Sequence, residues 1–152
     1  MNDPEALLRA ARLAAGAVLF AAAAAGAATN AAPGEAAGIP SGRIDAAALH
    51  ARMQKEPGLV VVDVRPAPFF EDCHVAGATN VPLKQVEQAV RDWPRDRAIV
   101  VYCQDRDCED SAKAALLLAR AGFGRVQHFA GGIREWRAGK FPTVGPAQLL
   151  DD

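Results

Sequence analysis

Cys103 is the residue of this chain best placed for nucleophilic chemistry. It ends the apolar run 98–102, which is typical of a buried strand, and a helical pattern follows over residues 110–121. The backbone N–H groups of a strand-to-helix loop, and the positive end of the helix, favour a thiolate and bind an anionic group on its sulfur. We therefore expect Cys103 to be a nucleophile, and the alternative is a small core residue without chemistry.

The loop after Cys103 is the expected binding surface for an anionic substrate. Its carboxylates outnumber its single cation, Arg106, so backbone dipoles must outweigh the side-chain charge. Arg106 either faces the substrate or pairs with a neighbouring acid. Asp107 and Glu109 are expected to cap the helix and to compensate its dipole in the first turn, with a catalytic role as the alternative. The residues assigned to this surface are Gln104, Asp105, Arg106, Asp107, Cys108 and Glu109.

Two further cysteines bear on the chemistry. Cys108 lies five positions after Cys103, close enough for a local disulfide, so it is a candidate redox partner. A thiol redox protein that uses both residues is therefore one alternative function. Cys73 is expected to be a small buried residue, with a third redox partner as the alternative.

Composition narrows the classes of function. The 152-residue chain is 51% hydrophobic with a net charge of −1, so it has the core of an ordinary globular domain and no basic surface for nucleic acid. The cysteine spacing lacks a second pair for zinc, and no glycine-rich phosphate loop is present. We expect no metal and no organic cofactor.

The elements that position the loop alternate between helical and strand patterns, which predicts an α/β fold with a parallel sheet. The apolar run 58–64 is typical of a strand covered on both faces. Strands are expected at 58–64, 80–82, 98–102 and 125–129, and helices at 45–55, 68–72, 83–93, 110–121 and 133–137.

The amino-terminal segment 1–28 is expected to be a signal peptide or an N-terminal membrane anchor. Arg9 and Arg12 precede the uncharged run 13–28, which also makes that run a candidate membrane tether. The domain would then be exported, to the periplasm or another extracytoplasmic place. An alanine-rich helix without targeting function is the alternative. Residues 29–42 read as a flexible linker, 43–142 as the folded domain and 143–152 as an exposed tail.

Several motifs in one order resemble the rhodanese domain. They are Val62-Asp63-Val64-Arg65, the segment 73–82, Val101-Tyr102-Cys103, Gly131-Gly132-Ile133 and Trp136, and the resemblance spans residues 44–142. It implies a rhodanese-like three-layer α/β/α sandwich with a parallel five-stranded sheet. It also implies a sulfurtransferase that moves sulfane sulfur through a Cys103 persulfide, from thiosulfate or a persulfide to cyanide or a thiol, which includes a thiol on a protein.

The loop departs from the usual rhodanese pattern. Rhodaneses usually have glycine at the third position after the cysteine and arginine at the fifth, where this chain has Arg106 and Cys108. It resembles the subgroup with an enlarged loop and a second cysteine. Related phosphatases need arginine at the sixth position, where Glu109 stands, so phosphatase chemistry is not expected. A catalytically inactive rhodanese-like binding module, with Cys103 kept as a scaffold residue, is a further alternative.

Two residues near the expected site have structural explanations. Arg65 is placed at the rim of the site and is expected to pair with Glu71 or Asp72, with substrate contact as the alternative. His74 lies in a turn motif and is expected to be a hydrogen-bonded structural residue.

Overall fold

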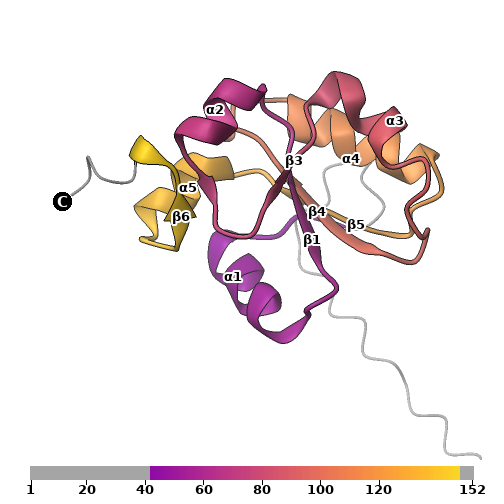
Figure 1. Ribbon diagram of the computed structural model, residues 1–152. Coiled ribbons are helices and arrows are strands. Elements are labelled where there is room, and N and C mark those ends of the chain that lie inside the picture. Colours follow the sequence, from indigo (N-terminus) through magenta and orange to yellow (C-terminus); the bar gives the residue numbers. More distant parts are fainter. Residues whose placement is uncertain (1–41, 148–152) are drawn as a thin grey trace, which may run out of the picture. The chain divides into compact units, whose positions relative to one another are not determined.

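The computed structural model describes residues 42–147 (Figure 1). The expected signal peptide or anchor, residues 29–41 of the expected linker and residues 148–152 of the expected tail lie outside the described residues. Within residues 42–147, no helix has the length and apolar character needed to cross a bilayer. The elements are α1 (Ala46–Lys55), β1 (Val60–Asp63), α2 (Ala67–Asp72), β2 (His74–Val75), β3 (Thr79–Asn80), a 3-10 helix (Leu83–Gln85), α3 (Val86–Ala89), β4 (Ala98–Tyr102), α4 (Asp110–Arg120), β5 (Arg125–Phe129), α5 (Gly132–Ala138) and β6 (Thr143–Val144).

The main sheet is parallel and has the strand order β3-β1-β4-β5. Four strands are seen in the described residues, where five were expected. Next to β5, where a fifth strand could pair, the structure has a single parallel bridge between Arg43 and His128. This pairing stops after Ile44 because Asp45 caps α1, its side chain accepting a hydrogen bond from the N–H of Ala48 at 2.8 Å.

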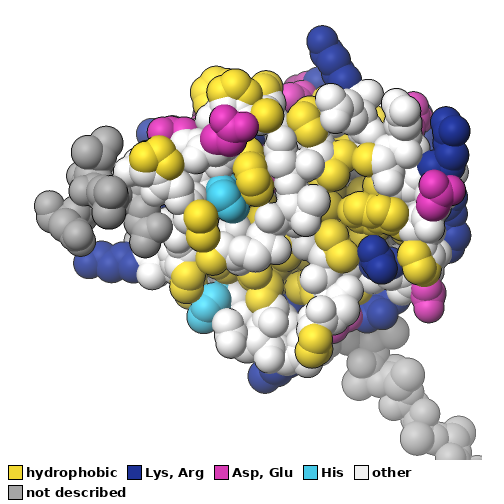
Figure 2. Space-filling view, viewed as in Figure 1, with side chains coloured by type: hydrophobic (Ala, Val, Ile, Leu, Met, Phe, Trp, Pro, Cys, Tyr) yellow, Lys and Arg dark blue, Asp and Glu magenta, His cyan; other side chains and the backbone are white. Residues whose placement is uncertain are grey.

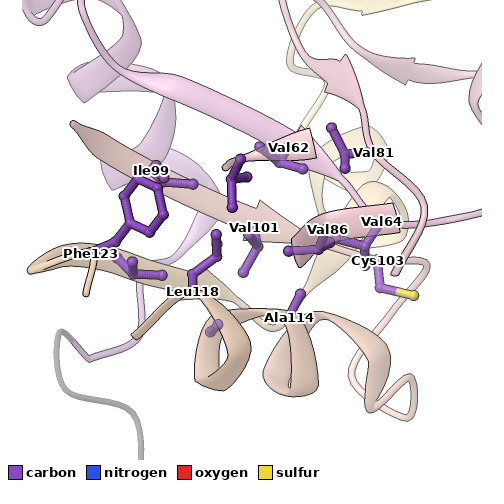
Figure 3. Packing of buried hydrophobic residues seen from close by; sticks show 13 residues of the cluster. Val62, Val64, Val81, Val86, Ile99, Val101, Cys103, Ala114, Leu118 and Phe123 are labelled. Carbon is purple, nitrogen blue, oxygen red and sulfur yellow. The ribbon is translucent and has the colours of Figure 1, made fainter. Parts of the chain in front are cut away.

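Helices cover both faces of this sheet, which confirms the three-layer α/β/α architecture. Successive residues of a strand point to opposite faces, so Val62 and Val101 pack against α3 and α4. Val61 and Val100 pack on the other side against α1 and α5. Figure 1 shows α3 and α4 on one side of the strands and α1 on the other. The side chains of the α3 and α4 face are drawn in Figure 3.

The expected helix 83–93 is shorter in the structure. A 3-10 turn, Leu83–Gln85, leads into the four-residue helix α3, and the chain then leaves the α conformation. The N–H of Trp93 donates to the carbonyl of Val90, a tighter bond than that of an α-helix. Pro94 disfavours the helical conformation at the residue before it, which accounts for the early end.

Residues of the expected tail 143–152 take part in the fold. Thr143–Val144 form β6, which pairs antiparallel with β2, His74–Val75. The carbonyl of Pro142 accepts hydrogen bonds from the indole N–H of Trp136 at 2.8 Å and from the backbone N–H of Ala76 at 3.1 Å. These contacts attach the end of the domain to the segment that follows α2. Hydrophobic side chains gather on the surface over α2 (Figure 2), where Phe69 is 57% exposed.

Candidate active site

Cys103 follows the last residue of β4, at the carboxyl edge of the parallel sheet. All five residues of β4 are buried, and Cys103 is 3% exposed. Figure 3 shows its sulfur at the margin of the core cluster, directed away from Val101 and Leu118. The expected placement of the thiol at the end of a buried strand is therefore present.

The beginning of α5 holds the start of the loop. The N–H of Ile133 donates to the carbonyl of Cys103 at 3.0 Å, and the N–H of Arg134 donates to the carbonyl of Gln104 at 3.1 Å. This close approach needs Gly132, whose φ is +60°, because no side chain fits there. The Gly131-Gly132 pair is thus part of the site's framework.

Cys103 and Cys108 form a disulfide, with their Cα atoms 6.3 Å apart. Cys103 is buried and Cys108 is partly buried. A carboxylate oxygen of Asp110, in the first turn of α4, lies within 4.8 Å of both sulfurs. Cys73 is buried with a free thiol. The structure brings together the two cysteines that the sequence singled out and keeps the third apart from them.

Several N–H groups of the loop have no hydrogen-bond partner among the residues that the structure describes. The N–H of Cys108 donates to the carbonyl of Asp105 at 3.3 Å, and that of Asp107 donates to the Asp105 side chain at 3.2 Å. Among residues 42–147, no acceptor is found for the backbone N–H of Gln104, Arg106 or Glu109. Unpaired donors of this kind are available to an anion.

The charged side chains of the loop are paired with α5 or with α4. Arg106 forms an ion pair with Glu135, and Arg134 lies 3.7 Å from Asp105. Of the two alternatives for Arg106, the structure therefore shows the ion pair. Glu109 occupies the N-cap position of α4, but its side chain makes no capping hydrogen bond and instead contacts Lys113 at 3.0 Å.

An open pocket of about 420 Å³ lies between the loop and α5. It has mixed charge, with three carboxylates and two guanidinium groups, and both guanidinium groups are already paired with acids. The pocket therefore offers no strong positive field to a dianion. Its lining residues are Asp105, Arg106, Asp107, Gly131, Arg134, Glu135 and Ala138.

Arg65 is buried and pairs with Asp63, not with Glu71 or Asp72 as expected. Its guanidinium binds both carboxylate oxygens of Asp63, at 2.7 Å for the closest pair. Burial disfavours the charged guanidinium, but the hydrogen bonds and charge of Asp63 outweigh it and raise the pKa of Arg65. The two side chains lie two positions apart, so the extended backbone directs them to the same side.

Arg65 also connects β1 to the loop. It donates to the side-chain carbonyl of Gln104 at 2.9 Å and to the backbone carbonyl of Cys73 at 2.6 Å. Arg65 was expected at the rim of the site, and in the structure it contacts the loop through the side chain of Gln104. With its donors engaged by three residues, Arg65 positions the loop.

The pair Ser111 and His128 carries no motif by which the sequence marks it as a site. Both are buried, and the Ser111 hydroxyl is hydrogen-bonded to Nε2 of His128 at 2.9 Å. Burial, helped by the charge of Arg43, lowers the pKa of His128, which favours the neutral ring. Ser111 shares a helix face with Ala115 and Leu118, so helical periodicity was the signal that predicts its burial.

Two other polar residues near the site have structural roles. Tyr102 ends β4, and its hydroxyl accepts a hydrogen bond from the N–H of Val75 at 3.1 Å. Burial, with the nearby charge of Asp63, raises the pKa of Tyr102, so this phenol stays neutral. His74 stacks on Phe70 and bonds its backbone carbonyl through Nδ1 at 2.7 Å, which confirms the structural role expected for it.

Comparison with known proteins gives a consistent family. The profile of the rhodanese-like domain matches residues 45–139. A sulfurtransferase of Allochromatium vinosum is 29% identical over 103 residues, which cover 68% of this chain and 94% of that protein. The thiosulfate sulfurtransferase GlpE of Pseudomonas fluorescens is 32% identical over 100 residues, which cover 66% of this chain and 85% of that protein.

Solved structures show the same fold. The crystal structure of the BH2092 protein from Bacillus halodurans superposes with a TM-score of 0.65 at 32% identity, covering 70% of this chain and 79% of that one. The solution structure of the rhodanese-like domain of the Alr3790 protein from Anabaena superposes with a TM-score of 0.63 at 32% identity, covering 70% and 80% respectively.

Proposed function

The chain belongs to the rhodanese-like domain family, and on that premise we propose that it is a sulfurtransferase that carries sulfane sulfur on Cys103. Distant relatives named sulfurtransferase and thiosulfate sulfurtransferase support this class of reaction. The observation that carries the proposal is the position of Cys103, at the end of a buried strand and before a loop with unpaired N–H donors.

The reaction begins from the reduced form of the site. The Cys103 thiolate attacks the outer sulfur of a donor such as thiosulfate, a new sulfur–sulfur bond forms, and sulfite leaves with the electron pair of the broken bond. An acceptor, either cyanide or a thiolate, then attacks the outer sulfur of the persulfide. Cys103 leaves as a thiolate, and thiocyanate or a new persulfide is the product.

Residues Gln104 to Glu109 act in this proposal as the substrate-binding loop. The unpaired N–H groups of Gln104, Arg106 and Glu109 stabilise the negative charge of the persulfide. Hydrogen-bond donors that are already in position stabilise such a charge without reorganisation of the protein. Arg65 acts through Gln104 and is a positioning residue. No step of this chemistry needs a metal or an organic cofactor.

The proposal includes export of the domain. Arg9 and Arg12 before an uncharged run favour an N-terminal targeting or anchoring segment, and the disulfide is a bond that persists in oxidising compartments. Fractionation of cells that produce the full chain tests this: the protein should be found outside the cytoplasm, and removal of residues 1–28 should leave it inside.

Sulfur loading followed by cyanide tests the sulfurtransferase. Cys108→Ser protein, which keeps one thiol in the loop, is reduced and treated with thiosulfate; it should carry one extra sulfur atom on Cys103, and cyanide should release it as thiocyanate. Adding Cys103→Ser to this variant should remove both signals. Adding Cys73→Ser is the matched control, because Cys73 is also buried but lies outside the loop, and both signals should remain. Failure of thiosulfate, a polysulfide and an organic persulfide to load Cys103 would instead indicate a binding module.

A further inference from the structure

The second thiol of the loop has no part in sulfur transfer as described above. A persulfide carrier needs one sulfur in the protein, because both donor and acceptor arrive from solution. Here Cys108 lies in the same loop and is bonded to Sγ of Cys103. In the folded domain, Cys108 thus reaches the atom that would carry the outer sulfur.

We propose that Cys108 displaces the outer sulfur from Cys103 as hydrosulfide, so that the site reduces sulfane sulfur to sulfide. This inference rests on the proposed persulfide of Cys103. The Cys108 thiolate attacks Sγ of Cys103, a bond forms between the two cysteine sulfurs, and the bond from Sγ to the outer sulfur breaks. The outer sulfur takes the electron pair and leaves as HS⁻. Two cysteines are oxidised to a disulfide while the sulfane sulfur is reduced, and the proton lost by Cys108 passes to the leaving sulfur, so that the persulfide anion departs as HS⁻.

The disulfide of the structure is then the product state of this step. A dithiol reductant must return it to two thiols, becoming a disulfide itself. Cys108 is the more exposed of the two, whereas Cys103 is 3% exposed, so the reductant reaches Sγ of Cys108 first. Attack there expels Cys103 as the thiolate, which is the form needed for the next donor.

The surroundings favour a discharge inside the protein over a stable persulfide. Asp110 places a carboxylate oxygen within 4.8 Å of both sulfurs, and the adjoining pocket has more acids than bases. A persulfide anion on Cys103 is repelled by these charges, whereas a disulfide carries no charge. Departure of HS⁻ therefore removes this repulsion. A persulfide that waits for an acceptor from solution keeps the repulsion until the transfer takes place.

A single-turnover experiment without external thiol tests the inference. Full-length protein is reduced with a dithiol, freed of reductant under anaerobic conditions and mixed with thiosulfate labelled in its outer sulfur. We expect wild type to release one equivalent of labelled sulfide per chain and to form the Cys103–Cys108 disulfide in equal amount. Cys108→Ser and Cys108→Ala should release no sulfide above a protein-free control and should keep the label on Cys103 until cyanide is added. Cys73→Ser should behave as wild type.

The outcomes separate this inference from the proposed function. If wild type keeps the label on Cys103 and forms no disulfide, the sulfide-releasing step is wrong while the sulfurtransferase stands. Equal sulfide release by wild type and both Cys108 variants also overturns it, because the displacement then comes from elsewhere. If no protein with an intact Cys103 takes up label, the persulfide itself is absent and both proposals fail. The amount of disulfide formed by wild type is a readout that does not depend on the folding of any variant.

Discussion

Gly132 lies so close to Cys103 that a Cβ on Gly132 would be 2.5 Å from the carbonyl oxygen of Cys103. The nearest atoms are all backbone of Cys103 and Gln104, so no side chain can move aside to make room. The positive φ of +60° is a second obstacle to any other residue. The first turn of α5 is therefore in backbone contact with the loop that carries the nucleophile.

Gly132→Ala should lower both stability and sulfur loading. Strain at this backbone conformation costs about 1–3 kcal/mol of unfolding free energy, and displacement of the loop disturbs the N–H donors. Urea unfolding and persulfide formation measure the two effects. Gly58→Ala is the control, since a Cβ there meets nothing within 4 Å. Normal sulfur loading by Gly132→Ala would contradict the role assigned to this contact.

Asp63→Asn should destabilise the domain strongly. It leaves the buried guanidinium of Arg65 without its counterion, a change that costs about 3–5 kcal/mol. The contact from Arg65 to Gln104 should loosen as well, so sulfur loading falls. Glu56→Gln is the comparison, because it breaks ion pairs with Arg52 and Arg125 at the surface and should cost less than about 1 kcal/mol. Equal losses for the two variants, measured by urea unfolding, would speak against the Arg65 pair.

His128 should contribute a pH dependence to stability. Burial and the charge of Arg43 lower its pKa in the folded state below the ordinary value of 6.5. As the pH falls below about 6.5, the unfolded chain binds the proton first, so folding loses free energy until the folded-state pKa is reached. Urea midpoints at pH 7.5 and 5.5 should therefore differ more for wild type than for His128→Gln. His50→Gln, which leaves His128 in place, should keep the wild-type difference; the same difference in all three proteins would refute the assignment.

Glu135→Gln should improve the use of thiosulfate. The change removes one negative charge from the pocket and frees Arg106 from its ion pair. We expect the KM for thiosulfate to fall several-fold, with a larger effect at low ionic strength because salt screens exposed charges. Glu87→Gln removes a carboxylate of α3 that does not line the pocket and is the matched control. An unchanged KM at every salt concentration would show that the pocket charges do not select the donor.

Features that depend on residues close to one another in sequence could be predicted from the sequence alone. The expected strands 98–102 and 125–129 coincide with β4 and β5. The pattern is clearest for β4, because an apolar run that is buried on both faces is typical of a central parallel strand. The same pattern put Cys103 at a strand end. The helix expected at 83–93 was less well predicted, because Pro94 and 3-10 hydrogen bonds decide its length.

Partners that are distant in the chain were not predictable in this way. Arg65 has acids on both sides in sequence, and only the turn of the backbone after β1 decides that Asp63 is its partner. Arg106 meets Glu135, and Ser111 meets His128, because α4, α5 and β5 converge at one edge of the sheet. Charge and polarity mark such residues as needing a partner, but they do not say which one.

The sequence by itself determined the strand-loop-helix around Cys103, the parallel α/β fold and the presence of a second thiol within reach, since each follows from local pattern and spacing. Only the tertiary structure decided that Cys103 and Cys108 are bonded, that α5 holds the loop through its backbone, and that the nearby cations are already paired. These are contacts between segments brought together by burial of the sheet on both faces, and their geometry is fixed by packing across the whole domain.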